Sequence, residues 1–518
     1  MKKNRLLPLV LSAVFLSSCT FSLGGSTSSN KAASVTSSKP ITSSIISAES
    51  TSFMQSDVAL AGADPVLPSV GTQKILVIPV MVDDYKMNAT EANLARIQKN
   101  FFGEAKDTSW ESLASYYEKS SYGKLKLTGT VTSWYDCGYT TTQINNLKGT
   151  STNFDPTWAV LDGAVEWYKK TYNSDGQEFD QNHDGYLDGV WLVNSAPDSG
   201  KVRSLGDNFW AFTYSNYEKN ASKTSPNGWR YCWASYDFMD GYGTSGIDAH
   251  TYIHETGHLM GLDDYYVSKT ISGTKNYGPM GGIDMMDDNI IDHNAYSKFA
   301  LGWIDPFVVR GSTTVTLSPS STSGQAILLP TSDGWNGSAF DEYMLLEYYT
   351  PTNLNEKDSA HYYPENEIQG FTENGVRIYH VDARLALVTA TTGGNSFSYT
   401  DNLVDPTASS ATYLAHSNSN YYNNLDQNFR LIQEMDCTEK RNFDTEAFVY
   451  QSRSYGITAD NDTLFQNGDS FDLETYKNSF PNYYYNKAAI MNDGSSFSYK
   501  ISFGAMTEEG ASLTITKA

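Results

Sequence analysis

The residues best suited to chemistry in this chain lie in the segment H-E-T-G-H, residues 254–258. Residues four apart share one face of a helix, so His254 and His258 can direct two imidazole nitrogens at one zinc ion. Glu255 is then positioned to act on a water molecule as a general base and afterwards as a general acid. The structural alternative is a buried helix whose two histidines are satisfied by hydrogen bonds.

A glycine and an acid follow at the spacing that a third ligand requires. Gly261 comes three residues after His258 and can turn the chain out of the helix through a left-handed conformation. Asp264 then occupies the third-ligand position of the extended pattern H-E-x-x-H-x-x-G-x-x-[H/D]. Asp263 competes for the same role, and the register of the pattern favours Asp264.

His250 continues the four-residue spacing upstream of the motif. Two helical turns separate it from His258, about 12 Å along the axis, so it cannot reach the same ion. We therefore expect His250 to be a polar residue of the first helical turn, with Asp248 as the N-cap.

A second candidate metal site is the acidic segment at residues 180–191. Oxygen-bearing side chains occupy positions 1, 3, 5 and 9 of a calcium loop, and Gly185 occupies position 6. Position 12 is Trp191 instead of a bidentate glutamate, so a calcium ion would need a ligand from elsewhere. The alternative is a turn rich in Asp, Asn and Gly that leads into a strand. The candidate calcium ligands are Asp180, Asn182, Asp184 and Asp188.

Two adjacent methionines, Met285 and Met286, occupy a turn-rich stretch downstream of His258. A methionine beneath the metal is the soft floor of a Met-turn, and position favours Met286 for this role. Two ordinary core methionines are the alternative.

The elements that would position these residues belong to an α+β catalytic domain, predicted over residues 73–306. The continuous apolar run at residues 74–82 predicts a buried central strand. Residues 200–247 are loop-rich and aromatic, which indicates either the wall of a cleft or a carbohydrate-stacking surface. The remaining periodicities predict helices over residues 89–102, 109–120 and 156–172, and strands over residues 121–129 and 189–195.

The rest of the chain, residues 307–518, is predicted to be a β-rich, sandwich-like region because short apolar runs alternate with turn residues. His380 and Asp382 would face the same side of one strand, either hydrogen-bonded structurally or as a second metal site. The expected strands are residues 313–317, 326–329, 344–348, 376–380, 431–435, 496–503 and 512–516. Downstream of Cys19, the cysteines Cys137, Cys232 and Cys437 allow at most one intramolecular disulfide.

Composition narrows the class of protein. The formal net charge is −23 and the pI is near 4.7, which argues against nucleic acid or an anionic membrane surface as a partner. Charged residues make up only 18 % of the chain, whereas it has 36 tyrosines and 39 glycines, a mix that suits an extracellular β-rich protein. We expect a monomer whose partners are protein or peptide substrates.

The N-terminus has the features of a bacterial lipoprotein signal peptide, residues 1–19. A basic start precedes the apolar run at residues 6–16, which is too short to span a bilayer. Cys19 ends a lipobox-like sequence and would carry the lipid that holds the protein at the membrane; an ordinary signal peptide with a chance cysteine is the alternative. Residues 20–72 are rich in Ser and Thr and predict an unfolded tether, within which residues 53–70 could serve as a short pro-segment.

Taken together, these motifs resemble those of the immune inhibitor A family of metzincin-like zinc metallopeptidases. The similar segments are the zinc motif, a Met-turn-like D-M-M-D, and counterparts of the family's A-W-x-K-x-x-L-G-W and D-Y-Y-x-E-x-S-Y-G-K. In this chain they are residues 254–264, 284–287, 293–303 and 115–124. The resemblance covers residues 74–475 and implies a metzincin-type catalytic domain with peptidase activity on secreted or host proteins.

Two departures from the family pattern concern single residues. Asp263 stands where members often have proline, which keeps it in competition with Asp264. Tyr296 replaces the tryptophan of A-W-x-K, and no tyrosine follows Met286 by two residues. Tyr296 or Tyr265 is therefore the candidate donor to the oxyanion.

The sequence thus predicts a lipid-anchored zinc endopeptidase on the extracellular side of a bacterial cell surface. One zinc ion would be held by His254, His258 and Asp264, with Glu255 as the base. A non-catalytic adhesin or glycan-binding protein on a protease scaffold is the alternative. A nutrient-binding lipoprotein is disfavoured, because the chain shows no repeat of two similar α/β lobes.

Overall fold

The computed structural model of the chain describes residues 45–46, 53–58, 66–149, 154–241, 246–267, 278–364, 368–391, 394–401, 410–419, 425, 429–439, 443, 447–450, 453–479 and 490–518. The predicted signal peptide and Cys19 lie outside these residues. Within them, no helix is both long enough and apolar enough to cross a membrane. The described residues form a mixed α+β fold with several sheets and few helices, as the sequence predicts.

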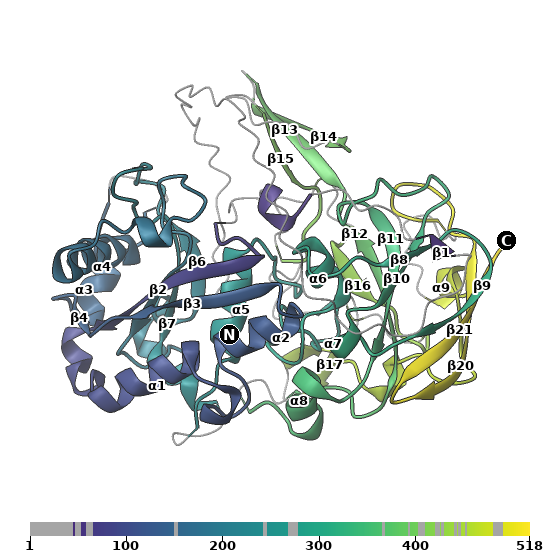
Figure 1. Ribbon diagram of the computed structural model, residues 1–518, viewed down its shortest axis with the longest axis horizontal. Coiled ribbons are helices and arrows are strands. Elements are labelled where there is room, and N and C mark those ends of the chain that lie inside the picture. The colour runs from purple at the N-terminus through teal and green to yellow at the C-terminus, as the bar shows by residue number, and fades with distance from the viewer. Residues whose placement is uncertain are drawn as a thin grey trace.

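A mixed sheet of six strands builds the N-terminal half, on the left of Figure 1. Its order is β3-β2-β5-β7-β6, and all neighbours are parallel except the antiparallel edge strand β6; β4 pairs with β2 as well. The bounds are β2 Gly71–Met81, β3 Leu125–Val131, β4 Tyr135–Asp136, β5 Val190–Asn194, β6 Phe212–Ser215 and β7 Arg230–Ser235.

Helices cover both faces of this sheet because the central strand β2 is apolar on both sides. Ile75 and Val77 pack in the same core as α1, α2 and α5, whereas Leu76 and Ile78 pack in a second core with α4. The helices of this half are α1 Glu91–Phe102, α2 Leu113–Ser120, α3 Thr141–Asn146, α4 Thr157–Tyr172 and α5 His250–Leu259. Helix α5, which carries the H-E-T-G-H segment, packs against β6, β7 and α2.

Two sheets dominate the C-terminal half: a six-stranded sheet in the order β1-β8-β10-β11-β12-β16 and a four-stranded sheet in the order β19-β20-β21-β9. Met344 and Leu346 of β11 share one core with the four-stranded sheet, whereas the alternate residues Tyr343 and Leu345 join the core of the N-terminal half. The six-stranded sheet is therefore covered on both faces, and the C-terminal half is β-rich as the sequence predicts.

Seven strands of the C-terminal half fall on the runs that the sequence predicts, and the other strands there were not expected. The main strands are β1 Ile45–Ile46, β8 Phe307–Val309, β9 Thr313–Leu317, β10 Ala326–Pro330, β11 Glu342–Tyr349, β12 Gly375–Asp382, β16 Ile432–Glu434, β19 Ser470–Asp472, β20 Tyr499–Thr507 and β21 Gly510–Lys517. The small sheets are β14-β13-β15, at the top of Figure 1, and β17-β18; they comprise β13 Leu385–Thr391, β14 Gly394–Thr400, β15 Ser410–Leu414, β17 Ala447–Tyr450 and β18 Arg453–Gly456. The helices are α6 Ala295–Ala300, α7 Ser320–Ser323, α8 Glu356–Ala360 and α9 Leu473–Ser479.

One apolar core crosses the predicted domain boundary between residues 306 and 307. Phe299 of α6 and Tyr343 of β11 belong to this core, with ring centroids 6.4 Å apart. Hydrogen bonds also cross the boundary: Trp110 Nε1 donates to Leu354 O at 3.2 Å, and Tyr122 Oη donates to Ser320 O at 2.6 Å. The two halves therefore pack as one unit.

Two stretches differ from the sequence-based expectation. Residues 200–247, predicted to be loop-rich, contain strands β6 and β7, and β7 is buried along its whole length. The sequence of β7 does not alternate between apolar and polar residues, because both faces of the strand are covered and the polar residues Arg230 and Ser235 at its ends are buried as well. The strand predicted over residues 121–129 begins only at Leu125, after a turn.

The described cysteines Cys137, Cys232 and Cys437 are all free thiols.

The predicted tether, residues 20–72, is shorter than the sequence suggests. Ile45 and Ile46 pair with β8, and Val58, Val66 and Leu67 are buried in the main core. The backbone N–H groups of Val66 and Leu67 donate to Leu259 O, at the end of α5, at 2.9 and 3.0 Å. Val66 and Leu67 therefore contribute to the core and satisfy a carbonyl group at the end of α5, and a pro-segment role for residues 53–70 stays a prediction.

Truncation should reveal this contribution. A chain that starts at residue 41 should match a chain that starts at residue 20 in urea unfolding. A chain that starts at residue 71 should lose about 4 kcal/mol or more, since burying each of three apolar side chains contributes about 1.5–3 kcal/mol. Equal unfolding midpoints for the chains starting at 41 and 71 would contradict the structural role.

Candidate metal centre

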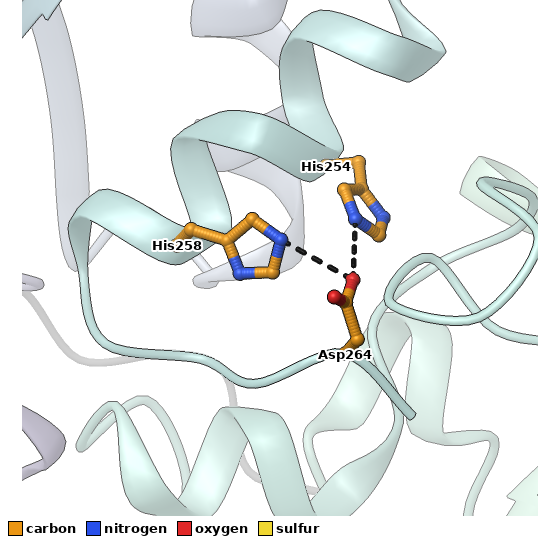
Figure 2. A group of neighbouring side chains, drawn as sticks. All are labelled: His254, His258 and Asp264. Atoms are coloured by element: carbon orange, nitrogen blue, oxygen red, sulfur yellow. Dashed lines mark hydrogen bonds and ion pairs between the residues drawn. The ribbon is translucent and has the colours of Figure 1, made fainter. Parts of the chain in front are cut away.

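Helix α5 presents His254 and His258 on one face, with ring centroids 4.8 Å apart and ring planes at 86°. The helix ends where Leu262 N donates to Gly257 O, and Gly261 adopts a φ of +97° that favours glycine. The chain then turns back, and Asp264 reaches the two imidazoles, as Figure 2 shows. The predicted consequence of the glycine is confirmed.

The three side chains form one compact cluster. Asp264 Oδ1 lies 3.0 Å from His254 Nε2 and 3.3 Å from His258 Nε2. All three potential ligand atoms lie within 4.8 Å of one another, and no other group of three His, Cys, Asp or Glu residues does so in the described parts of the chain. Asp263 instead directs its carboxylate to the hydroxyl groups of Ser417 and Ser419. Asp264 is thus the acid that faces both histidines.

Carbonyl groups set the tautomers of both histidines. His254 Nδ1 lies 2.8 Å from Met285 O, and His258 Nδ1 lies 2.8 Å from Leu262 O. A carbonyl oxygen only accepts, so each Nδ1 carries a proton and each neutral ring presents its Nε2 lone pair to Asp264. Two nitrogen lone pairs and a carboxylate oxygen at this separation repel one another unless a cation or a proton lies among them, and the donor set fits zinc.

The pKa values of His258 and Asp264 also show that this cluster favours a positive charge beside the Asp264 carboxylate. Burial alone would lower the pKa of His258, but the Asp264 carboxylate outweighs it and raises that pKa to about 9. Burial would raise the pKa of Asp264, yet His258 and His254 hold it well below its usual value.

Glu255 lies beside the cluster with a buried carboxylate. Thr213 Oγ1, from β6, lies 3.0 Å from Glu255 Oε2 and 2.9 Å from Glu255 O. Cys232 Sγ, from β7, lies 3.4 Å from the same backbone oxygen. Burial raises the pKa of Glu255. A carboxylate with a raised pKa is a better proton acceptor, and its acid form is a better match for proton return near neutral pH.

Met286 lies beneath the helix, where the sequence predicts the floor of a Met-turn. It is fully buried, and a Cβ on Gly257 would meet its Sδ at 2.8 Å, so the methionine packs directly against the helix at this glycine. Asp284 Oδ1 accepts from Met286 N at 2.8 Å, and Met286 O accepts from Tyr265 N at 2.8 Å. The same turn therefore supports the helix and the loop that carries Asp264.

Tyrosine assignments differ from the sequence-based expectation. Tyr296 is buried in α6 and its hydroxyl has no hydrogen-bond partner in the described parts of the chain, while the Tyr265 hydroxyl lies 2.7 Å from Ser297 Oγ. Tyr266, which sequence reasoning did not single out, is hydrogen-bonded to Asp264, and burial together with that carboxylate raises its pKa well above the ordinary value. Its position two residues after Asp264 is the one sequence signal that could have identified it.

In the calcium-like loop, many of the side-chain oxygens accept hydrogen bonds from backbone N–H groups of the same loop. Asp180 accepts from the N–H groups of Asp184 and Gly185, both at 3.1 Å, and Asp184 Oδ1 accepts from Tyr186 N at 2.8 Å. Asn182 Oδ1 accepts from Asp184 N at 2.9 Å. These are the contacts of a turn rich in Asp, Asn and Gly, and the loop forms no three-acid cluster within the described residues.

Asp188 is the exception, since its Oδ2 accepts from Gln181 N at 2.6 Å but its buried Oδ1 has no hydrogen-bond partner among the residues that the structure describes. Burial raises the pKa of Asp188 to about 8. Trp191, where a calcium loop would have glutamate, is a core residue of β5 whose Nε1 donates to Thr256 of α5 at 3.1 Å.

Calcium binding at residues 180–188 stays a prediction. Millimolar calcium should raise the thermal unfolding midpoint of the wild-type chain and leave that of Asp188→Asn unchanged, because the variant lacks one anionic ligand oxygen. An equal calcium effect on both chains, or none on either, would assign the loop a purely structural role.

Two further histidines have hydrogen-bonded, buried settings. His250 stays outside the cluster of His254, His258 and Asp264, as expected, but it is fully buried between Asp248, at 2.5 Å, and Asp358, at 3.2 Å. The sequence predicts Asp248 as the N-cap of α5, but the N-cap is the next residue, Ala249. The carboxylate of Asp248 still accepts a hydrogen bond from the backbone N–H of His250.

His380 and Asp382 belong to no group of three metal-ligating side chains within the described residues. His380 Nε2 lies 2.8 Å from Glu342 Oε1, and both Asp382 oxygens accept from Arg384. These contacts match the structural interpretation of this strand.

Comparison with known proteins adds no relative. No protein-family model matches the chain, and a search of curated proteins finds no match. The resemblance to the immune inhibitor A family therefore rests on the motifs alone.

Proposed function

We propose that the chain is a zinc-dependent endopeptidase with a metzincin-like catalytic domain, lipid-anchored through Cys19 on the bacterial cell surface. The observation that carries the proposal is the convergence of His254, His258 and Asp264 beside a buried glutamate. The anchor rests on the N-terminal sequence only.

The three side chains would hold one zinc ion. When bound, zinc would act as a Lewis acid and make a water molecule acidic enough to attack a peptide carbonyl near neutral pH. Glu255 would accept the proton of that water through its carboxylate and return it to the nitrogen of the departing amine. Tyr266, close to Asp264, is the better-placed tyrosine to donate to the developing oxyanion.

An extended peptide is the substrate that suits the surroundings. Strand β6 pairs with β7 on one side only among the described strands, so its other edge can accept the backbone of a peptide. Thr213 of this strand also touches Glu255, which would bring a peptide on β6 next to the base.

Thr213→Val should lower kcat about 10- to 100-fold with little change in KM, because it removes a hydrogen bond to a charged group but keeps the side-chain shape. Thr213→Ser, which keeps the hydroxyl, should retain wild-type turnover. Steady-state kinetics on a quenched fluorescent peptide measure both. A kcat for Thr213→Val equal to wild type would show that the hydroxyl does not hold the base.

The direct test uses the chain from residue 20 onward and a proteome-derived peptide library. We expect about one zinc per chain and peptide cleavage that stops with 1,10-phenanthroline and returns with zinc. Stoichiometric zinc without cleavage of any peptide would favour the adhesin or glycan-binding alternative.

A further inference from the structure

Three consecutive residues of the C-terminal half contact the loop that carries Asp264. Ser417, Asn418 and Ser419 follow strand β15, and they meet residues 263–265, the ligand loop. Ser417 Oγ donates to Asp263 Oδ2, and Ser419 Oγ donates to Asp263 Oδ1 at 3.0 Å. Ser417 and Asp263 are 154 residues apart in the chain, so only the tertiary fold brings them together.

The contacts fix the backbone on both sides of Asp264. Before it, Asp263 Oδ1 also accepts from Asp264 N at 3.0 Å, so the held carboxylate caps the N–H group of the ligand residue. After it, Asn418 Nδ2 donates to Tyr265 O at 2.8 Å.

Asn418 in turn ties the loop to the six-stranded sheet. Its Nδ2 also donates to Ile432 O at 2.8 Å, and its Oδ1 accepts from Ile432 N at 3.3 Å, at the start of β16. Residues 262–265 have no regular secondary structure of their own. The position of Asp264 therefore depends on an outside support, and a preorganised support reduces the entropy lost when a ligand binds.

We propose that residues 417–419 are positioning residues for the metal site, so that the C-terminal half completes the zinc centre through Asp263 and Tyr265. This inference rests on the proposed zinc site, and it gives the β-rich half a role in metal binding. Groups that orient metal ligands typically change metal affinity 10- to 100-fold when they are lost. Asp263, which competes with Asp264 in the sequence, becomes the anchor through which the support acts.

The test compares zinc affinity of the full chain in the wild type and in the double variant Ser417→Ala/Ser419→Ala, by competition with a chromogenic chelator. We expect the double variant to bind zinc about 10- to 100-fold more weakly and to stay folded in the metal-free state, with an unfolding midpoint lowered only by the loss of two hydrogen bonds to the Asp263 carboxylate. Ser417→Thr/Ser419→Thr, which keeps both hydroxyls, should recover most of the affinity.

Ser495→Ala is the matched control. It removes a buried serine hydroxyl in the same half, and this hydroxyl has no hydrogen-bond partner among the described residues. It should leave zinc affinity unchanged. Ser419→Ala alone, at a partly exposed position, should still weaken zinc binding and covers the case in which the double variant does not fold.

Wild-type zinc affinity in both Ser419→Ala and the double variant would overturn the inference. A fall in metal-free stability that accounts for the whole loss of zinc affinity would overturn it as well. A wild-type chain that binds zinc but cleaves no peptide would refute the peptidase function alone, because the zinc measurement does not depend on turnover.

Discussion

Glu255→Gln is expected to abolish peptide cleavage while zinc stays bound. Glutamine has the same shape and can still accept a hydrogen bond from Thr213, but its amide cannot take a proton from water. Because general acid–base catalysis contributes about 10²–10⁴-fold, kcat/KM should fall by at least this range. Steady-state cleavage of a fluorescent peptide and zinc analysis of the same sample measure both parts of the prediction.

The unfolding midpoint of Glu255→Gln separates a loss of catalysis from misfolding. The wild-type carboxylate is buried and its pKa is raised by that burial, so replacing it with a neutral amide should not lower the unfolding midpoint. Residual turnover within tenfold of wild type, in protein freed of contaminating protease, would mean that Glu255 is not the base.

Asp264→Ala is expected to remove zinc binding, because Asp264 is the one carboxylate that faces both imidazoles. Its loss should weaken zinc affinity by more than the 10- to 100-fold typical of residues that only orient ligands. Zinc at about 1,000 times its Kd adds about 4 kcal/mol to the stability of a folded protein, and this gain should be absent from the variant. Chelator competition and thermal unfolding with and without zinc provide the measurements.

Asp263→Asn is the control next in the chain. Asparagine keeps one oxygen for Ser417 or Ser419, so the variant should retain the zinc-dependent rise in unfolding midpoint, although with weaker affinity. If Asp263→Asn lost zinc completely while Asp264→Ala retained it, the assignment of the third ligand would be reversed.

Local patterns in the sequence identified the longer helices and many of the longer strands, but not the small sheets or the short helices. The expected strand at residues 313–317 is β9, the run at 376–380 is the middle of β12, and the helix at 156–172 is α4. Such elements follow from side-chain periodicity along a short stretch of chain. Strand β7 escaped because both its faces are buried, so that its residues lack the alternation of a half-exposed strand.

The sequence by itself determined the part of the site that helix geometry dictates: His254 and His258 on one face, Glu255 beside them, and a glycine turn that can return an acid. Only the tertiary structure decided which acid returns, because Asp263 and Asp264 are neighbours in sequence and differ in what surrounds them. Ser417 and Ser419, from a distant strand end, hold the first, which leaves the second facing the imidazoles. Contacts of this kind depend on how sheets and loops pack across the chain, and no spacing within a short motif encodes them.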